Sequence, residues 1–368
     1  MTRLHDLFDQ QHQSPWLDNL RRDWIESGEL SNWLDKGVRG LTSNPTIFQK
    51  AIGNSDAYDE QLATFVDSGA SVEDAYWGLV KTDIRDALEI LSGVHAASNG
   101  EDGYVSVEVA PSLAHDAAGT IAAARELDGD IDAPNLYIKI PGTQAGLGAI
   151  QQATSEGISV NVTLLFSLDR YAAVIEAYLA GLEAVDGDLS NISSVASFFV
   201  SRVDAAVDEQ LDEIGTPEAQ ALRGKVAVAN AVLAYDMAMK QFSGPRWEAL
   251  AARGARIQRP LWASTSTKDP SFPDTKYVDE LIGPDSVNTL PDGTLAAFLE
   301  QGTVARTIDA DVPGAQAVID GLPGVGVDLS AIAAKLEDDG VASFAASFDD
   351  LLETLQERMK AMNDQGTQ

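Results

Sequence analysis

Short runs of apolar residues recur along the chain and alternate with longer stretches of helical periodicity. Helical segments such as residues 71–97 and 224–242 separate these runs. Several runs are almost continuously apolar, which is typical of a strand buried on both faces of a sheet. The alternation therefore predicts an α/β protein with a parallel sheet. The candidate strands are residues 15–20, 37–44, 104–110, 136–143, 158–167, 192–201, 259–267 and 286–291.

Eight is the number of strands that closes a (β/α)8 barrel, or TIM barrel. An open, doubly wound sheet is the alternative, and it usually binds its ligand at a glycine-rich turn after the first strand. The sequence has neither a GxGxxG motif nor a GxxxxGK[ST] motif. We therefore expect a single barrel domain over residues 1–368, with additional helices between strands two and three and between strands six and seven.

A helical extension follows the last strand, starting at about residue 312. Its final segment, residues 341–363, carries apolar residues at helical spacing and predicts an amphipathic helix. The apolar residues that define this face are Phe348, Leu351, Leu352, Leu355 and Met359.

Lys139 lies in the middle of the apolar strand at residues 136–143. Burying an ammonium group costs several kcal/mol, so a lysine in such a place calls for an explanation. Desolvation favours the neutral amine, and a neutral amine can attack a carbonyl carbon to form a Schiff base. For a lysine considered alone, an edge strand or a structural pairing with a carboxylate is the more common explanation. The polar residues in the neighbouring strands favour the chemical one.

Four further polar residues lie among apolar neighbours in other candidate strands: Asp18, Glu108, Asn161 and Thr163. Asn161 and Thr163 are two positions apart and therefore share one face of their strand. In a barrel, all four can point toward one central lysine, where a shared hydrogen-bond network would satisfy them. Any one of them alone is equally well explained as a satisfied core residue or a capped strand end, but the set favours an active site.

A Schiff-base aldolase needs groups of these types. A carboxylate must exchange a proton with the hydroxyl beside the C–C bond that breaks, and Asp18 suits this role. A second acid–base group must move protons while the carbinolamine forms and collapses, and Glu108 with Thr163 suits it. Amides must hold the hydroxyls of the sugar, which Asn44 and Asn161 can do.

The charge balance limits the partners of this chain. It has 25 Lys and Arg against 57 Asp and Glu, a formal net charge of −32. Such a chain repels phosphate backbones and anionic lipid, which argues against nucleic-acid binding and against a membrane role. An anionic substrate would need local positive charge, and Arg202 and Lys268 both come at the ends of candidate strands. Barrel enzymes bind substrate phosphate at such ends, although each cation alone could be a solvated surface residue.

Other features exclude some chemistries. The chain has no cysteine, so disulfides, thiolate nucleophiles and Cys-ligated zinc are excluded. Its four histidines form no HExxH motif, and we predict no metal site. The first residues are polar and lack the apolar core of a signal peptide, and no apolar run approaches the roughly 18 residues of a membrane helix. We therefore expect a cytoplasmic protein.

Four segments of the chain resemble the transaldolase family. Residues 40–48 (GLTSNPTIF) resemble its Asn-Pro signature, and residues 136–143 (LYIKIPGT) resemble its Schiff-base lysine signature. Residues 161–167 and 197–202 are similar to two further strands of the family. The resemblance runs in order from about residue 14 to the C-terminal helix. It is strongest to the longer transaldolases of actinobacteria and cyanobacteria.

The resemblance implies a cofactor-independent enzyme of the non-oxidative pentose phosphate pathway, built on a (β/α)8 barrel. Such enzymes transfer a dihydroxyacetone unit from sedoheptulose 7-phosphate to glyceraldehyde 3-phosphate, giving erythrose 4-phosphate and fructose 6-phosphate. By match to the family's motifs, Lys139 forms the imine, Asp18 handles the proton of C–C cleavage, and Glu108 with Thr163 positions the catalytic water. The implied substrate-binding residues are Asn44, Asn161 and Ser197 for the dihydroxyacetone hydroxyls, Phe199 as an aromatic wall and Arg202 for the phosphate.

The chain departs from the family pattern at one position. Many members carry a second phosphate-binding arginine where this sequence has Ser266. We expect Lys268, with Ser264 and Ser266, to take over this role. A lysine binds phosphate as a point charge and lacks the bidentate fork of arginine.

Two other functions stay open at this point. One is a related aldolase that splits fructose 6-phosphate without an acceptor aldehyde. The other is a catalytically inactive barrel that acts as a binding protein. In either enzymatic case the partners are sugar phosphates, and the chain is expected to be a monomer or a homodimer.

Overall fold

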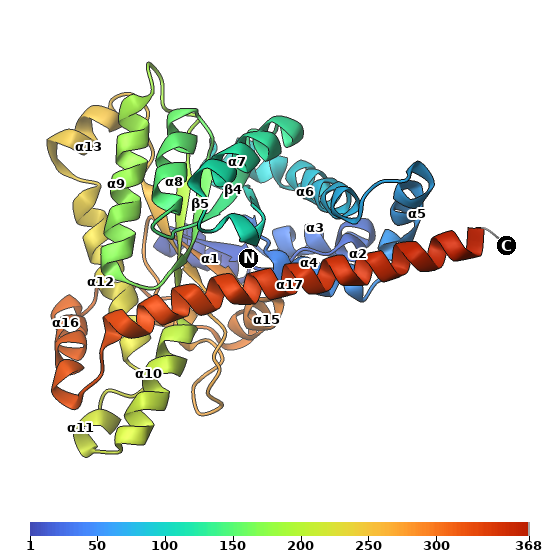
Figure 1. The fold of residues 1–368 in the computed structure, drawn as a ribbon. Helices are drawn as coiled ribbons and strands as arrows, with labels where there is room; N and C mark the ends of the chain where they lie inside the picture. Colours follow the sequence, from blue (N-terminus) through green and yellow to red (C-terminus); the bar gives the residue numbers. More distant parts are fainter. Residues whose placement is uncertain (367–368) are drawn as a thin grey trace.

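The computed structural model describes residues 1–366 and contains eight parallel strands closed into a barrel (Figure 1). The strands pair in chain order, and β8 pairs with β1 to close the barrel. All of their residues are buried. This confirms the predicted (β/α)8 barrel. The strands are β1 Gln13–Leu17, β2 Leu41–Thr42, β3 Val105–Glu108, β4 Leu136–Pro141, β5 Val160–Leu165, β6 Ser194–Phe199, β7 Gln258–Ala263 and β8 Ser286–Leu290.

Helices surround the barrel, and the insertions after β2 and after β6 are helical, as predicted. The helices up to β6 are α1 Arg3–Gln11, α2 Arg22–Ser27, α3 Glu29–Asp35, α4 Pro45–Gly53, α5 Asp59–Ser68, α6 Val72–Ala97, α7 Ala117–Ile131, α8 Gly146–Ser155 and α9 Leu168–Ala184. Those after β6 are α10 Ser201–Ile214, α11 Pro217–Gln220, α12 Val226–Gln241, α13 Gly244–Ala251, α14 Lys276–Asp279, α15 Asp292–Gln301, α16 Val312–Gly321 and α17 Leu329–Gly366. Short 3-10 turns are η1 Asp56–Tyr58, η2 Pro111–Leu113 and η3 Pro323–Val325.

The strands end earlier than the apolar pattern predicted, which frees polar residues at the carboxyl end of the barrel. Candidate strand 37–44 shrinks to Leu41–Thr42, because the Asn44 side chain leaves the sheet and accepts a hydrogen bond from the Ile47 backbone at 3.0 Å. Asn44 thereby becomes the N-cap of α4. Similarly, β1 ends at Leu17, so Asp18 follows the strand, and residues 264–268 after β7 form a loop.

A buried carboxylate closes the opposite, amino end of the barrel. Asp102 is fully buried and accepts hydrogen bonds from Arg39 at 2.7 Å, Arg259 at 3.1 Å, Ser14 at 2.8 Å and Trp16 at 3.0 Å. Burial by itself raises the pKa of this carboxyl, but the two arginines outweigh burial and hold the pKa below its usual value. The amino end of a TIM barrel commonly serves stability rather than chemistry.

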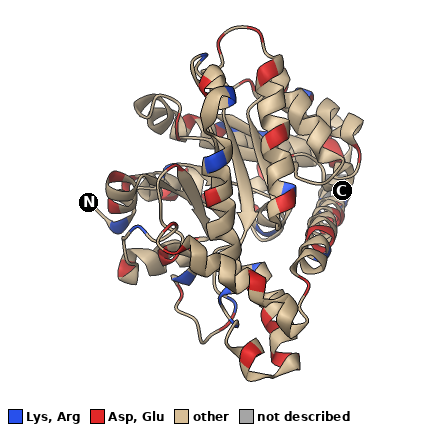
Figure 2. Cartoon of the chain, turned by 90° about the vertical axis from the view of Figure 1, so that its left-hand side faces the viewer, with Lys and Arg blue, Asp and Glu red and all other residues tan. Residues whose placement is uncertain are grey.

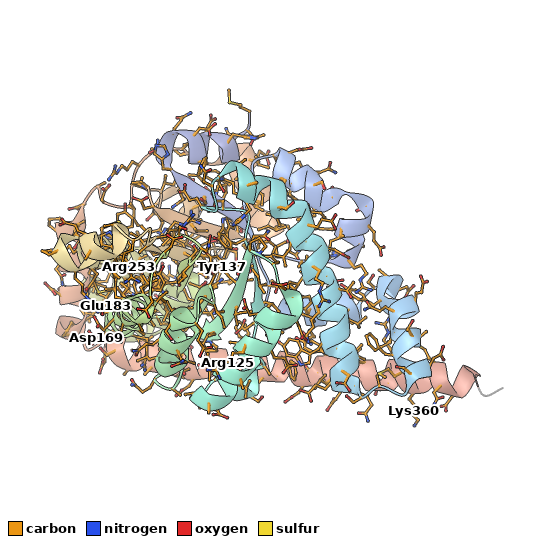
Figure 3. All side chains as sticks on the ribbon, turned by 90° about the horizontal axis from the view of Figure 1, so that it is seen from above. Arg125, Tyr137, Asp169, Glu183, Arg253 and Lys360 are labelled. Carbon is orange, nitrogen blue, oxygen red and sulfur yellow. The ribbon has the colours of Figure 1, made fainter. Side chains whose placement is uncertain are left out.

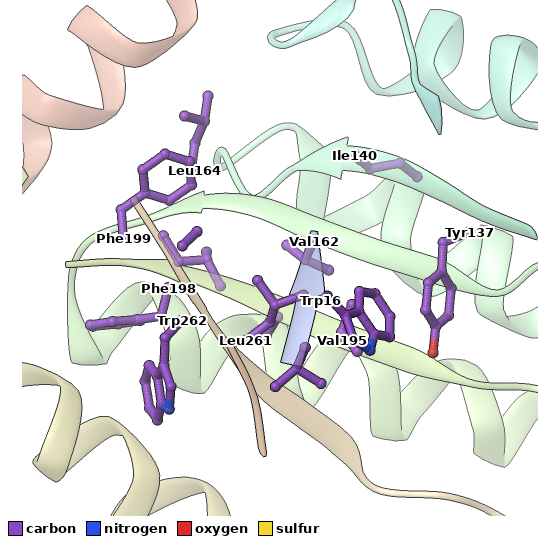
Figure 4. Packing of buried hydrophobic residues seen from close by; sticks show 14 of the residues in the cluster. Trp16, Tyr137, Ile140, Val162, Leu164, Val195, Phe198, Phe199, Leu261 and Trp262 are labelled. Carbon is purple, nitrogen blue, oxygen red and sulfur yellow. The ribbon is translucent and has the colours of Figure 1, made fainter. Parts of the chain in front are cut away.

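An aromatic layer lies above this carboxylate. Trp16 stacks on Tyr137 with ring centroids 6.1 Å apart (Figure 4), and Tyr137 stacks on Tyr104 with ring centroids 4.1 Å apart. Seen from above, Tyr137 lies well inside the molecule, whereas Lys360 lies at the far end of α17 (Figure 3). Large rings therefore fill the barrel interior between Asp102 and the layer of polar residues that contains Lys139. These polar residues pack against a close-packed aromatic layer.

The C-terminal helix α17 begins at Leu329 rather than at residue 341. It runs through Gly340, where an added Cβ would lie 2.8 Å from the Leu164 side chain, so the glycine allows the helix to pass close to β5. The predicted apolar face is confirmed: Phe348, Leu351 and Leu355 are buried. The helix extends along α4, α5, α6 and α10 (Figure 1).

Over residues 1–366, no single helix is long and apolar enough to span a membrane. The segments Val312–Val325 and Leu329–Asp364 meet the criteria of length and composition only when taken together, with a bend of 96° between them. Acidic residues are spread over many of the outer helices (Figure 2). The single-domain organisation over residues 1–368 stays a prediction.

Candidate active site

Lys139 stands at the centre of β4, inside the barrel. Paired residues of parallel neighbouring strands point to the same side, and the register pairs Lys139 with Glu108 on β3 and with Asn161 on β5. The lysine is only 4 % exposed. Its Nζ donates a hydrogen bond to the Ser43 carbonyl at 3.2 Å and lies 3.5 Å from Glu108 Oε2. The predicted buried lysine is therefore paired, but the ammonium retains donor capacity for a ligand.

Two carboxyl groups flank this lysine and have perturbed proton affinities. Burial raises the pKa of Glu108 to about 7, although the Lys139 charge opposes the rise. Burial likewise raises the pKa of Asp18, against the opposing effects of Lys139 and of a hydrogen bond donated by Thr42 at 2.8 Å. Such shifts bring carboxyl groups toward the pH range in which they exchange protons with substrate.

Glu108 and Thr163 carry buried polar atoms that make no hydrogen bond to the described residues. They are both carboxyl oxygens of Glu108 and the hydroxyl of Thr163, although Glu108 Oε2 forms the ion pair of 3.5 Å with Lys139 Nζ. Thr163 lies at the β-bulge between Val162 and Leu165, where the strand loses its regular register. Buried polar groups of this kind are usually satisfied by water or by a ligand, because leaving them unpaired costs about 1–3 kcal/mol each.

A chain of amide and hydroxyl groups crosses the barrel beside Lys139. The Asn161 amide donates a hydrogen bond to Ser106 at 3.0 Å, and the Ser197 hydroxyl donates one to Asn161 Oδ1 at 2.7 Å. Asn161 is completely buried, and Ser197 is nearly so. The chain orients these side chains, so that Ser197 presents a fixed polar group at the end of β6.

A cavity of about 500 Å³ opens above Lys139 at the carboxyl end of the barrel, and we call it the central cavity. Its lining includes most of the predicted residues, while Glu108, Asn161 and Thr163 are buried next to it. The predicted residues in the lining are Asp18, Asn44, Lys139, Ser197, Phe199, Arg202, Ser264, Ser266 and Lys268. Its volume suits a small polar ligand.

The lining of the central cavity includes the predicted cations Arg202 and Lys268. The Arg202 guanidinium lies 5.2 Å from the Phe199 ring centroid, and Lys268 donates a hydrogen bond to the Ser266 hydroxyl at 2.8 Å. Ser264 shares a hydrogen bond of 2.9 Å with Ser201. The predicted cations and hydroxyls therefore share the lining of the central cavity with Lys139 and Asp18, and the charge of Arg202 acts on the Asp18 carboxyl.

Sequence reasoning missed several residues of this cavity. Thr42 lies two positions before Asn44, and this spacing was a signal that it shares the face of a site residue. Lys50, on α4, gave no local signal. Ser343 and Phe344 reach the cavity from α17, and the Phe344 ring centroid lies 5.9 Å from Lys139 Nζ. Phe344 lies in the segment 341–363 that was expected to be helical, but it was not among the residues of the predicted apolar face.

A second and larger cavity, of about 600 Å³, lies between α9, α12, α16 and the start of α17. It contains none of the predicted site residues and no group with an unsatisfied buried polar atom. Elsewhere too, residues 1–366 hold no group of three or more His, Asp or Glu side chains placed to hold a metal ion.

Comparison with known proteins gives consistent results. Residues 15–355 match the family described as Transaldolase/Fructose-6-phosphate aldolase. A curated relative from Frankia alni named Transaldolase is 52 % identical over 349 residues, which cover 94 % of each chain. The Transaldolase of Thermobifida fusca is 51 % identical over 351 residues, covering 94 % of this chain and 95 % of the relative. The Transaldolase of Mycobacterium leprae is 49 % identical over 355 residues, covering 95 % of each.

Proposed function

Because the chain belongs to the transaldolase/fructose-6-phosphate aldolase family, we propose that it transfers a dihydroxyacetone unit between sugar phosphates through a Schiff base on Lys139. The proposed donor is sedoheptulose 7-phosphate and the acceptor is glyceraldehyde 3-phosphate, with erythrose 4-phosphate and fructose 6-phosphate as products. The observation that carries this proposal is the buried Lys139 with Glu108 at 3.5 Å, at the base of a polar cavity.

Imine formation begins with attack of the Lys139 amine on the ketone carbon of the donor. The new C–N bond gives a carbinolamine, which loses water to become the imine. Glu108 has a pKa of about 7, so it can both accept and return a proton near neutral pH. Its oxygens and the Thr163 hydroxyl make no hydrogen bond to the described residues and suit the binding of the water that leaves and later returns.

Asp18 acts in the C–C step. It takes the proton of the hydroxyl on the carbon that becomes the aldehyde, so that a C=O bond forms there. The electron pair of the C–C bond that breaks at this carbon moves into the protonated imine to give an enamine. The first aldose phosphate leaves as an aldehyde. The enamine then attacks the carbonyl carbon of the acceptor, Asp18 returns the proton, and water releases the new ketose from Lys139. Burial raises the pKa of Asp18, which makes it a better proton acceptor.

The remaining residues hold the substrate. Asn44 and Ser197 line the central cavity near Lys139 and are proposed to bind the dihydroxyacetone hydroxyls, with Asn161 holding Ser197 in place. Phe199 forms an apolar wall. The phosphate is proposed to bind among Arg202, Ser264, Ser266 and Lys268.

The test is chemical trapping. The protein is incubated with fructose 6-phosphate and reduced with borohydride, and the adduct is mapped by peptide mass spectrometry. We expect a dihydroxyacetone-sized or hexose-phosphate-sized adduct on Lys139 and none in Lys139→Arg. A folded wild-type protein that gives no adduct on Lys139 would refute the mechanism and favour an inactive, ligand-binding barrel.

A second assay separates the transferase from a simple aldolase. Turnover of fructose 6-phosphate is measured with and without erythrose 4-phosphate as the acceptor. We expect turnover to depend on the acceptor, in line with the names of the relatives. Equal release of free dihydroxyacetone without an acceptor would instead indicate fructose 6-phosphate aldolase activity. Cytoplasmic location, independence from cofactors and a monomeric or dimeric state stay predictions of the sequence.

A further inference from the structure

Three cations line the central cavity and form no ion pair with a carboxylate among the described residues: Lys50 on α4, Arg202 at the start of α10 and Lys268 after β7. Arg21 also lines the cavity, but its guanidinium donates hydrogen bonds to Asp23 at 3.0 and 2.6 Å. The chain has 57 acidic and 25 basic residues, so most lysines and arginines can form an ion pair within the protein. A group of cations that forms no such ion pair is available to bind an external anion.

The three charges are close enough to influence one another. Burial lowers the pKa of Lys268 first, and the charges of Arg202 and Lys50 lower it further. Lys50 also acts on the carboxyl of Asp18, though less than burial, Lys139 and Arg202 do. Like charges that repel one another weaken the free protein slightly, and an anion placed between them removes the repulsion.

The helix that carries Arg202 adds a further favourable feature. α10 has 14 residues, and its N-cap residue Val200 provides no side-chain hydrogen bond. The first turn of a helix carries partial positive charge, which favours a nearby anion, while its Ser201 and Val203 amides already donate to the Ser264 and Val200 carbonyls. The two carboxylates that face the cavity have other partners: Asp18 accepts a hydrogen bond from Thr42, and Asp292 interacts with Arg21.

We propose that Lys50 is a phosphate-binding residue, which completes a three-cation site with Arg202 and Lys268 and makes the enzyme selective for phosphorylated sugars. The ligand chemistry is a phosphate monoester dianion. Lys50 reaches the phosphate from α4, whose N-cap Asn44 is proposed to bind the dihydroxyacetone hydroxyls, so this helix contacts two parts of the ligand. This inference rests on the proposed function for the identity of the ligand, but not for the presence of the anion site.

The direct test uses inorganic phosphate as the probe, with binding to the resting enzyme measured by calorimetry at fixed ionic strength. One charge-assisted contact is worth about 1.5–3 kcal/mol, so Lys50→Gln should weaken phosphate binding about 10-fold or more. Lys50→Arg should retain most of the affinity. Lys360→Gln, which removes the same charge at the far end of α17 (Figure 3), should leave binding unchanged.

A kinetic test asks whether Lys50 acts on the phosphate or on the chemistry. With glyceraldehyde as a common acceptor, kcat/KM is compared for fructose 6-phosphate and for fructose. We expect Lys50→Gln to lower kcat/KM for the phosphorylated donor about 10-fold, mainly through KM, and to leave fructose within about 2-fold. An equal loss with both donors would overturn the proposal, because Lys50 would then act through Asp18.

Unchanged phosphate binding in Lys50→Gln would also overturn it. Phosphate binding requires no turnover, so the two ideas can fail separately. A protein that forms no imine, but loses phosphate affinity in Lys50→Gln, would refute the proposed function and leave the anion site standing. If the protein forms the imine, and Lys50→Gln changes neither phosphate affinity nor kcat/KM, the proposed function would stand and the role of Lys50 would be refuted.

Discussion

Replacement of Glu108 by Gln tests the acid–base chemistry of the site. The carboxyl is buried 3.5 Å from Lys139 Nζ, and its pKa is about 7. If Glu108 serves as the base that activates water, the rate of imine turnover rises as pH passes through about 7 and is level above it. Glutamine keeps the size of the side chain but cannot titrate. We expect Glu108→Gln to lower kcat/KM about 10²–10⁴-fold and to abolish this rise.

The same substitution has a consequence for stability, and its sign follows from the pKa. Burial raises the pKa of Glu108 from 4.5 to about 7, so between these pH values the folded protein holds a proton that the unfolded chain has released. The stabilisation is complete below pH 4.5 and is lost as pH rises through 7. A shift of this size corresponds to about 3 kcal/mol. As pH rises from 4.5 to 8, the free energy of unfolding of the Gln variant should therefore increase by about 3 kcal/mol relative to that of wild type.

Two measurements check the reasoning. Initial rates between pH 5.5 and 9 give the pH profile of kcat/KM, and urea unfolding at pH 5 and pH 8 gives the free energies of unfolding. Glu126→Gln, whose side chain is 72 % exposed, is the control and should match wild type in both. A Glu108→Gln variant whose kcat/KM lies within about 3-fold of wild type would refute the assigned role of Glu108. A difference in the free energy of unfolding that does not change with pH would refute the raised pKa.

Three further changes test other parts of the molecule. Asp18→Asn should still trap the imine with borohydride while the rate of C–C cleavage falls about 10²–10⁴-fold; loss of trapping would contradict a role confined to cleavage. Phe344→Leu removes the ring that faces Lys139 and should lower kcat about 3- to 30-fold with little change in KM. Phe348→Leu on the same helix, where the ring contacts Tyr76 instead, should leave kcat unchanged. Asp102→Ala leaves two arginines at the amino end of the barrel without their carboxylate. It should lower the free energy of unfolding, measured with urea, by about 3–5 kcal/mol without changing KM. A loss under about 1 kcal/mol would show that water replaces the carboxylate.

The strands and much of the chemistry could be predicted from the sequence because both depend on local patterns. Continuous apolar runs mark strands buried on both faces, and all eight predicted strands are present. Polar residues interrupting such runs stood out against their neighbours, as Lys139, Glu108 and Asn161 did. The register then brings these three to the same side of adjacent strands. An interruption within one strand is visible in the sequence without knowledge of any other segment.

Other features of the site depend on contacts between distant segments. The sequence did not predict that Lys50 and Lys268 approach one another, because closure of the barrel decides which strand ends and helix starts become neighbours. Similarly, α17 brings Phe344 to Lys139 across the carboxyl end of the barrel, and nothing in its own periodicity separates this ring from any other apolar position.

The sequence by itself determined the helices and strands of this protein and the polar residues that interrupt its apolar strands. Helices and strands each bury side chains at a characteristic spacing, and this spacing is visible within a short segment. Only the tertiary structure decided which groups remain unpaired. Among the described residues, the missing hydrogen bonds of the Glu108 oxygens and the missing ion pairs of Lys50, Arg202 and Lys268 are properties of the assembled surroundings. A charge or a hydroxyl is available for chemistry only when every neighbour has been placed and none has satisfied it.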